Sequence, residues 1–272
     1  MKGKRIIALL LTAAVAIGLM TACGSSSGGS SESAEAEGST WDKIEEAGVL
    51  TVGTEGTYSP YTFHDSDDNL VGYDVEVVEA IGDKLGIDIE WTEGNFDGLI
   101  AGMDANKYDM VANQITITEE RLQKYIFSDP YTYVFGVIIT RDDYDEISSF
   151  EDLDGKQIAL TTTSNWAQLS ESYGATIVPT NGFPESIQLV QEERADGTVN
   201  DNVTFLDYLN QKPDAKVKIA AASDEINESA LIMRKDDTDL RDKINEALKE
   251  LADEGTLTEI SMKYFGEDIS KK

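Results

Sequence analysis

The chain has 272 residues, with 22 Lys and Arg against 52 Asp and Glu, which gives a formal net charge of −30. Since nucleic-acid binding needs a basic face, this charge argues against DNA or RNA as a partner. Hydrophobic residues make up 40% of the chain, enough for the core of one large domain or two smaller ones. The single Cys and single His argue against disulfide scaffolds and Cys-rich or His-rich metal sites, so we expect no metal and no cofactor.

The first 22 residues have the pattern of a secretory signal peptide, with three basic residues before an apolar run at 6–20 that is short for a membrane span. The letters MTAC at 20–23 resemble a bacterial lipobox, which predicts that Cys23 is lipidated and anchors the protein to the cell membrane on its extracytoplasmic side. An ordinary signal peptide with an incidental Cys is the alternative. Residues 23–38 contain six Ser and four Gly and are expected to be a flexible tether.

From residue 39 onward, strand patterns alternate with helix patterns. In the first half we expect helices at 41–47, 74–85 and from 96, with Thr40 and Asn95 as N-caps. The expected strands lie at 49–53, 87–91, 109–112 and 134–140, and a hairpin pairs 62–64 with 70–72. This alternation predicts an α/β fold with a largely parallel sheet.

A second unit is expected to begin near residue 141. Its predicted strands are 156–160, 176–178, 197–199, 217–220 and 230–233. Its predicted helices are 150–153, 164–172, 183–193 and 203–209, and two more helices, 238–253 and 256–264, close the chain.

Several motifs, in order, resemble those of the amino-acid-binding proteins of ABC importers. They are GTEGTYSPYTF at 53–63, GYDVE at 72–76, DGLI at 97–100, TITEER at 116–121, FSDPY at 127–131, ND at 200–201 and YFG at 264–266. The resemblance runs from about residue 40 to the end. It implies the type II periplasmic-binding-protein-like fold, with two α/β lobes joined by two crossover strands. Lobe 1 would comprise 39–138 and 229–272, and lobe 2 would comprise 139–228.

The resemblance also implies a function. It implies a monomeric, non-enzymatic protein that captures a polar amino acid by closing its two lobes and delivers it to an ABC permease. Closure has a physical cause if both lobes contribute contacts to one ligand.

An amino acid presents a carboxylate and an ammonium, and a water-excluding site must pair both. Arg121 can bind a carboxylate bidentately. From the sequence alone it could also lie on a solvated helix face, but the resemblance places it at the family's carboxylate-binding position. Asp201 is the expected ammonium partner, with an N-cap of the helix at 203–209 as the alternative. The resemblance adds further contacts near the two charges: Thr116, Ile115 and the carbonyl of Gln114, and, from lobe 2, Ser164 and Asn165.

The far end of the ligand is expected to meet three aromatic residues and one acid. Tyr58, Phe96 and Trp166 lie at or near pocket positions of the family and can enclose a flat or apolar group; core packing is the alternative, most evenly for Phe96. Glu55 aligns with an acidic family position, where it would favour a second ammonium and repel a second anion. Its alternative is an exposed acid among many.

Two ligand classes fit such a pocket: basic amino acids and cystine. The segments GTEGTY at 53–58, NQIT at 113–116, TSNW at 163–166 and FGED at 265–268 are similar to the cystine-binding branch and favour cystine over Arg, Lys or His. The alternative from another class is an enzyme, since relatives with this fold include dehydratases of prephenate-like substrates, here prephenate or arogenate. Glu55 would be the candidate general acid.

Overall fold

The alternation of strands and helices expected from residue 39 onward is confirmed in the computed structural model, which describes residues 38–272. Its helices are α1 (Thr40–Ala47), α2 (Tyr73–Leu85), α3 (Phe96–Asp104), α4 (Glu119–Lys124), η1 (Phe150–Leu153), α5 (Asn165–Ser172), α6 (Phe183–Gln191), α7 (Asn202–Gln211), α8 (Thr238–Glu254) and α9 (Thr256–Phe265). Its strands are β1 (Val49–Thr54), β2 (Thr57–Tyr58), β3 (Thr62–His64), β4 (Leu70–Val71), β5 (Asp88–Glu93), β6 (Met110–Thr116), β7 (Tyr125–Phe127), β8 (Thr132–Arg141), β9 (Gln157–Leu160), β10 (Thr176–Pro179), β11 (Thr198–Asp201) and β12 (Val217–Arg234).

The predicted signal peptide, the lipidation site Cys23 and the tether up to residue 37 lie outside the described residues. Within 38–272, no helix combines the length and the apolar character needed to cross a membrane.

Most of the strands form one mixed sheet in the order β11-β8-β12-β6-β1-β5, and β7 also pairs with β12. β1 runs parallel to β5 and β6, as expected for this part of the chain. β12 is antiparallel to its partners β6, β7 and β8. All seven residues of β6 are buried, as in a strand covered on both faces. The end of β6 therefore lies in the interior, where its polar residues need partners.

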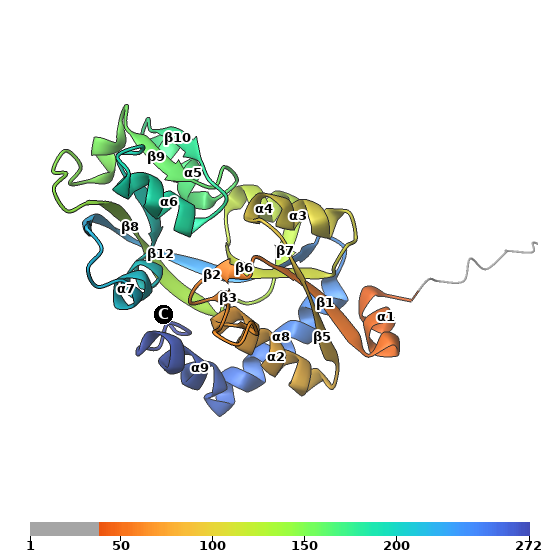
Figure 1. Cartoon of the computed structure of the whole chain (residues 1–272). Coiled ribbons are helices and arrows are strands. Elements are labelled where there is room, and N and C mark those ends of the chain that lie inside the picture. The colour runs from red at the N-terminus through yellow and green to blue at the C-terminus, as the bar shows by residue number, and fades with distance from the viewer. Residues whose placement is uncertain (1–37) are drawn as a thin grey trace, which may run out of the picture. The chain divides into compact units, whose positions relative to one another are not determined.

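β8 and β12 run between two groups of elements (Figure 1). The first group includes β1, β5, α1, α2, α8 and α9, whose largest apolar cluster contains Leu50, Ile81 and Leu248. The second group includes β9, β10, α5 and α6 and has its own apolar clusters. β8 and β12 are thus the two expected crossover strands. The predicted lobe boundaries near 138 and 228 fall inside these strands, and the exact division remains a prediction.

The prediction of separate strands at 217–220 and 230–233 is wrong, because β12 is continuous from Val217 to Arg234. The residues between the two predicted strands include a polar run at 223–229. Residues 226–229 of this run pair with β8, and 223–225 lie in a register shift between Ala222 and Ile226. Pairing with a neighbouring strand overrides the local sequence preference.

The predicted N-cap of the first helix is also wrong by one residue. Ser39 caps α1 by accepting a hydrogen bond from the N–H of Asp42, while the Thr40 hydroxyl donates to Asp237 at 2.6 Å. Two short strands, β2 and β7, were not predicted. Each has only two or three residues, too few for a periodic pattern.

The missing side chain of Gly136 makes room for the Trp166 indole. Gly136 on β8 pairs with Asp201 on β11. A Cβ built at position 136 would lie 2.5 Å from the indole ring of Trp166, a distance that real Cβ contacts do not reach. The Trp166 indole, which is 6% exposed, therefore packs directly against the backbone of β8 at Gly136.

We predict that Gly136→Ala lowers the free energy of unfolding by about 1–3 kcal/mol, because the methyl group overpacks the site and displaces the indole. Urea denaturation followed by fluorescence measures this. Gly94→Ala is the matched control, since a Cβ there has only Leu99 nearby, at 3.8 Å. Equal losses in the two variants would contradict the packing argument.

Candidate functional site

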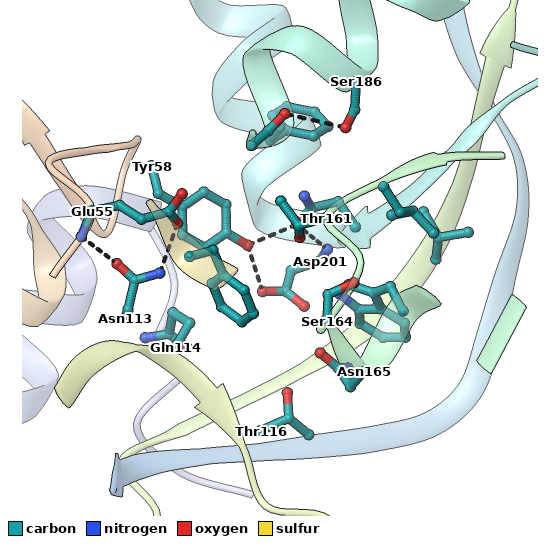
Figure 2. A pocket seen from close by; sticks show the side chains of 17 residues that line it. Glu55, Tyr58, Asn113, Gln114, Thr116, Thr161, Ser164, Asn165, Ser186 and Asp201 are labelled. Carbon is teal, nitrogen blue, oxygen red and sulfur yellow. Dashed lines mark hydrogen bonds between the residues drawn. The ribbon is translucent and has the colours of Figure 1, made fainter. Parts of the chain in front are cut away.

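One cavity lies between the two groups of elements and is lined by residues from both (Figure 2). Its lining consists of Glu55, Tyr58, Phe96, Asn113, Gln114, Thr116, Leu160, Thr161, Ser164, Asn165, Trp166, Gly182, Phe183, Ser186, Val199, Asn200 and Asp201. Nine of the eleven predicted ligand-binding residues are in this set. Ile115 is not, because its side chain is buried in an apolar cluster, and Arg121 is not a lining residue either.

Asp201 ends β11 and stands at the N-cap position of α7, but its side chain makes no capping hydrogen bond. The alternative role as a helix cap is therefore wrong. Its Oδ2 accepts hydrogen bonds from the hydroxyls of Tyr58 and Tyr61, both at 3.3 Å. Burial raises the pKa of the Asp201 carboxyl to about 6, although these hydrogen bonds lower it. At pH 7 the site thus presents a desolvated carboxylate, which attracts a cation.

Gln114 lies near the end of β6 in a left-handed conformation, with φ of 50°. Asp74 of α2 holds it there by accepting hydrogen bonds from its backbone N–H at 2.8 Å and its side-chain amide at 2.5 Å. Asp74 is fully buried, and burial raises its pKa to about 7. Strained backbone of this kind persists only where the surroundings hold it.

Arg121 is 8% exposed, so the alternative of a solvated helix face is wrong. Thr118 caps α4 by accepting from the N–H of Arg121 at 3.3 Å. The guanidinium donates to two carbonyl oxygens, that of Thr116 at 2.9 Å and that of Thr163 at 3.2 Å. Burial lowers its pKa to about 10, so it remains charged at pH 7. Within residues 38–272 its hydrogen bonds go to carbonyls and not to a carboxylate, and an anion would meet a desolvated cation here.

Ser164 caps α5 by accepting from the N–H of Ala167 at 3.0 Å. Its hydroxyl oxygen is thus engaged, while Asn165 and Trp166, which also line the cavity, open the helix. First-turn N–H groups of a helix favour an anion nearby.

Glu55 follows β1 and is 7% exposed, so the alternative of an exposed acid is wrong. Asn113 donates to its Oε2 at 2.8 Å. Burial raises the pKa of the Glu55 carboxyl to about 7, and the nearby charge of Asp97 raises it further. Phe96 fills both of its expected roles, because it lines the cavity and packs against an apolar cluster.

The polar groups of the cavity are separated in space. In Figure 2, Glu55 and Asn113 lie on one side, Thr116, Ser164 and Asn165 lie toward the other, and Asp201 lies between. The arrangement suits a ligand with charged groups at both ends.

The sequence analysis missed several lining residues, namely Asn113, Leu160, Thr161, Gly182, Phe183, Ser186, Val199 and Asn200. For three of them the sequence held a signal, namely their position near the end of a strand. Asn113 and Asn200 adjoin the predicted Gln114 and Asp201 near the ends of β6 and β11, and Thr161 follows β9. Ligands of open α/β sheets bind outside such strand ends.

Hydrogen bonds beside the cavity cross directly between the two groups, with α3 and α4 packed in the first group and α7 in the second. Asp97 of α3 accepts from the backbone N–H of Thr163 at 3.0 Å and from its hydroxyl at 2.8 Å. Arg121 binds the carbonyl of the same residue. On another side, the Ser59 hydroxyl donates to Asp207 of α7 at 2.9 Å. Thr163 is thus held to the first group through its N–H, its C=O and its side chain.

The chain belongs to the bacterial extracellular solute-binding proteins, family 3, whose model matches residues 50–267. It is therefore a solute-binding protein that works outside the cytoplasm. It is 40% identical over 269 residues, 98% of this chain and 99% of the relative, to a Bacillus subtilis protein named L-cystine-binding protein TcyA.

Two solved structures show the same type II, two-lobed fold. One is the L-cystine solute receptor of Neisseria gonorrhoeae in the unliganded open conformation, which is 39% identical, covers 86% of this chain and 100% of that one, and gives a TM-score of 0.59. The other is an ancestral arginine-binding protein bound to arginine, which is 36% identical, covers 80% and 99%, and gives a TM-score of 0.76. The better superposition on the liganded structure agrees with the hydrogen bonds that cross between the lobes.

We predict that Thr163→Val weakens the affinity for the solute by about 3- to 10-fold, because it removes one hydrogen bond to the Asp97 carboxylate that forms only when the lobes meet. The loss should be the same for every solute that binds, since Asp97 lies outside the cavity lining. Calorimetric titration measures it, with Thr176→Val, at an exposed position of β10, as the control. An unchanged affinity would remove this contact from closure.

Proposed function

We propose that this protein captures L-cystine outside the cytoplasm by closure of its two lobes and delivers it to an ABC importer. One observation carries the proposal. Two buried carboxylates, Asp201 and Glu55, line a single cavity, and neither forms an ion pair with a basic side chain of the described residues. A ligand with two ammonium groups compensates both charges.

The Glu55 side of the cavity also has a place for a carboxylate, because α6 begins next to it. A Cβ built on Gly182, the residue before α6, would lie 3.4 Å from Glu55 Oε1. An acid beside a helix start suits the ammonium and the carboxylate of a second amino-acid head group. Cystine has a second head group, whereas arginine, lysine and histidine do not.

The names of relatives support the same ligand. They include the L-cystine-binding protein of Bacillus subtilis and the L-cystine receptor of Neisseria gonorrhoeae. A basic amino acid remains the alternative within the class, because the similar ancestral protein was crystallised with arginine and a single far ammonium would also satisfy Glu55.

An enzyme of the prephenate or arogenate dehydratase kind is the candidate from another class. One observation favours it, since the pKa of Glu55, raised by burial to about 7, is suited to a general acid. Against it, the Asp201 carboxylate in the same cavity repels a dicarboxylate such as prephenate.

We further propose that the mature protein is a monomer held to the cell membrane by a lipid on Cys23. The lipobox-like letters at 20–23 and the Gly- and Ser-rich segment after them support this. The tether would let the binding unit reach the permease.

The proposal is tested by calorimetric titration of residues 38–272, unfolded and refolded to remove bound ligand. The panel contains cystine, cysteine, Arg, Lys, His, Gln and Glu, and prephenate with turnover followed. We expect 1:1 binding of cystine. We also expect Arg121→Ala and Asp201→Ala each to lose at least about 30-fold in affinity, since removing one partner of a buried charge pair costs about 2–5 kcal/mol.

Lys124→Ala on α4, where the side chain is exposed, is the control for Arg121→Ala. Binding of Arg, Lys or His alone would replace cystine by the basic class. Consumption of prephenate without amino-acid binding would refute the proposal, and tight binding by Arg121→Ala or Asp201→Ala would refute the contact assigned to that residue.

The binding of a ligand with a far ammonium should weaken as the pH falls. Such a ligand favours the ionised form of Glu55, whose pKa is about 7, so protonation competes with binding. Between pH 8 and pH 6 we expect a loss of about tenfold. Asp201, with a pKa of about 6, adds a further loss below pH 6 for every amino acid.

Glu55→Gln should remove the pH dependence between 8 and 6.5 and leave the loss at lower pH. Titrations at several pH values, in buffers of different ionisation enthalpy, measure both the affinity and the proton released. The same pH profile in the variant and the parent protein would rule out Glu55 as the titrating group.

A further inference from the structure

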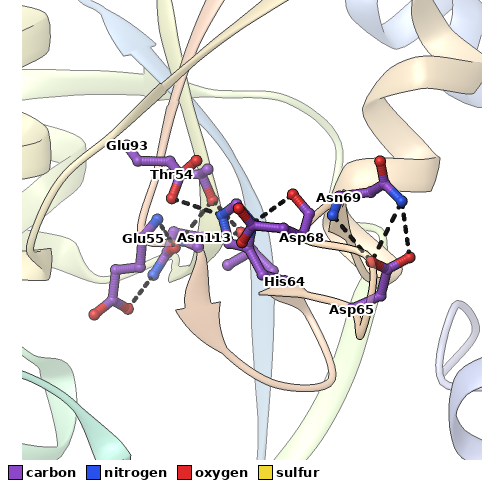
Figure 3. A network of polar contacts seen from close by, with 10 residues as sticks. Thr54, Glu55, His64, Asp65, Asp68, Asn69, Glu93 and Asn113 are labelled. Atoms are coloured by element: carbon purple, nitrogen blue, oxygen red, sulfur yellow. Dashed lines mark hydrogen bonds and ion pairs between the residues drawn. The ribbon is translucent and has the colours of Figure 1, made fainter.

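Asn113 is a fully buried side chain of β6 that hydrogen-bonds both the backbone and the side chain of Glu55. Its Oδ1 accepts from the Glu55 N–H at 2.8 Å, and its Nδ2 donates to Glu55 Oε2 at 2.8 Å. Figure 3 shows Asn113 between the Glu55 carboxylate and Thr54. The Thr54 hydroxyl lies within hydrogen-bond distance of two oxygens, Asn113 Oδ1 at 3.2 Å and the Thr62 hydroxyl at 2.8 Å.

The orientation of the Asn113 amide is determined by these partners. The buried N–H of Glu55 is a donor and requires an acceptor, so the oxygen of the amide must face it. The NH₂ group must then face the carboxylate. A rotation of the amide by 180° would leave one buried N–H facing another and one oxygen facing a carboxylate.

We propose that Asn113 is a positioning residue that determines selectivity, because it fixes the Glu55 carboxylate where the far ammonium of the ligand binds. The inference rests on the proposed function. Glu55 follows the last residue of β1, and Gly56 beside it has a positive φ of 69°, so the strand alone does not hold its side chain. A carboxylate held in place before binding loses less conformational entropy when the cation arrives.

The loop that carries Glu55 is supported on its other side as well. The N–H of Gly56 donates to the Thr62 hydroxyl at 3.2 Å, and a Cβ at position 56 would collide with Glu93. Glu93 in turn pairs with His64 at 3.0 Å. These contacts fix the backbone, whereas the side chain of Asn113 and the backbone N–H of Phe96 bind the carboxylate itself.

The test compares two ligands that differ only at the far end. L-cystine has a second head group, and S-(methylthio)-L-cysteine has the same disulfide without it. If the titration panel gives a basic amino acid instead, lysine and norleucine form the pair. The preference is the ratio of the two dissociation constants, measured for the parent protein, Asn113→Ala, Glu55→Gln and the double variant.

We expect Asn113→Ala to reduce the preference by about tenfold, the effect of losing a charge-assisted hydrogen bond that orients the acid. In the Glu55→Gln background the same change should leave the preference unchanged, because the group that Asn113 orients is gone. Asn200→Ala is the matched control. It removes another buried cavity Asn, which contacts Tyr58 and not Glu55, and should weaken both ligands equally.

An equal loss for both ligands in Asn113→Ala, or the same further loss of preference in the Glu55→Gln background, would overturn the inference and leave the proposed function intact. A parent protein with no preference would overturn the proposed function first. If Asn113→Ala does not fold, as judged by circular dichroism and thermal melting, Asn113→Ser keeps a small polar group at the position and the same criteria apply.

Discussion

The structure depends on burying charged groups that do not neutralise one another. Asp201 and Glu55 line the cavity as desolvated carboxylates, and Arg121 lies buried beside it with carbonyl oxygens as its partners. Isolated buried charge is costly. Burial therefore raises the pKa of the two carboxyls and lowers that of the guanidinium, which disfavours the charged form of each group. In the proposed mode of binding, the carboxylate and the ammonium groups of the ligand complete the pairs that the protein leaves open. The free energy that opposes burial in the empty protein then favours binding.

The fold brings these groups together because strand ends from both lobes open onto one cavity. Glu55 follows β1, Asn113 and Gln114 lie near the end of β6, and Asp201 ends β11. Each is held by hydrogen bonds with other residues: Asn113 holds Glu55, Asp74 holds Gln114, and the hydroxyls of Tyr58 and Tyr61 hold Asp201. Such supporting contacts fix the geometry of the groups that would touch the ligand.

Most of the elements could be predicted from periodicity, caps and glycines, and the family motifs located most of the cavity. The failures have physical causes. β12 was predicted as two strands because the polar residues in its middle follow no strand pattern, and 226–229 are held in the strand by pairing with β8. Asn113 was overlooked because the sequence does not show that this Asn is buried or that it hydrogen-bonds Glu55. Motif and composition also could not distinguish a helix cap from a ligand-facing acid at Asp201. The two roles differ in the direction of the Asp201 carboxylate. That direction is set by hydrogen bonds from Tyr58 and Tyr61 of the other lobe.

One of the junctions between the lobes lies outside the cavity lining at the far end of the pocket. Thr163 is held by Asp97 and Arg121 through its backbone and hydroxyl, groups that do not meet the far end of a ligand. Glu55, Phe183 and Ser186 lie in the cavity and take no part in that junction. A change at the far end of the pocket that leaves Asp97, Arg121 and Thr163 in place can therefore alter the preferred ligand while this junction persists. Solved structures of similar proteins named for cystine and for arginine share this fold, as expected if this junction does not depend on the far end of the ligand.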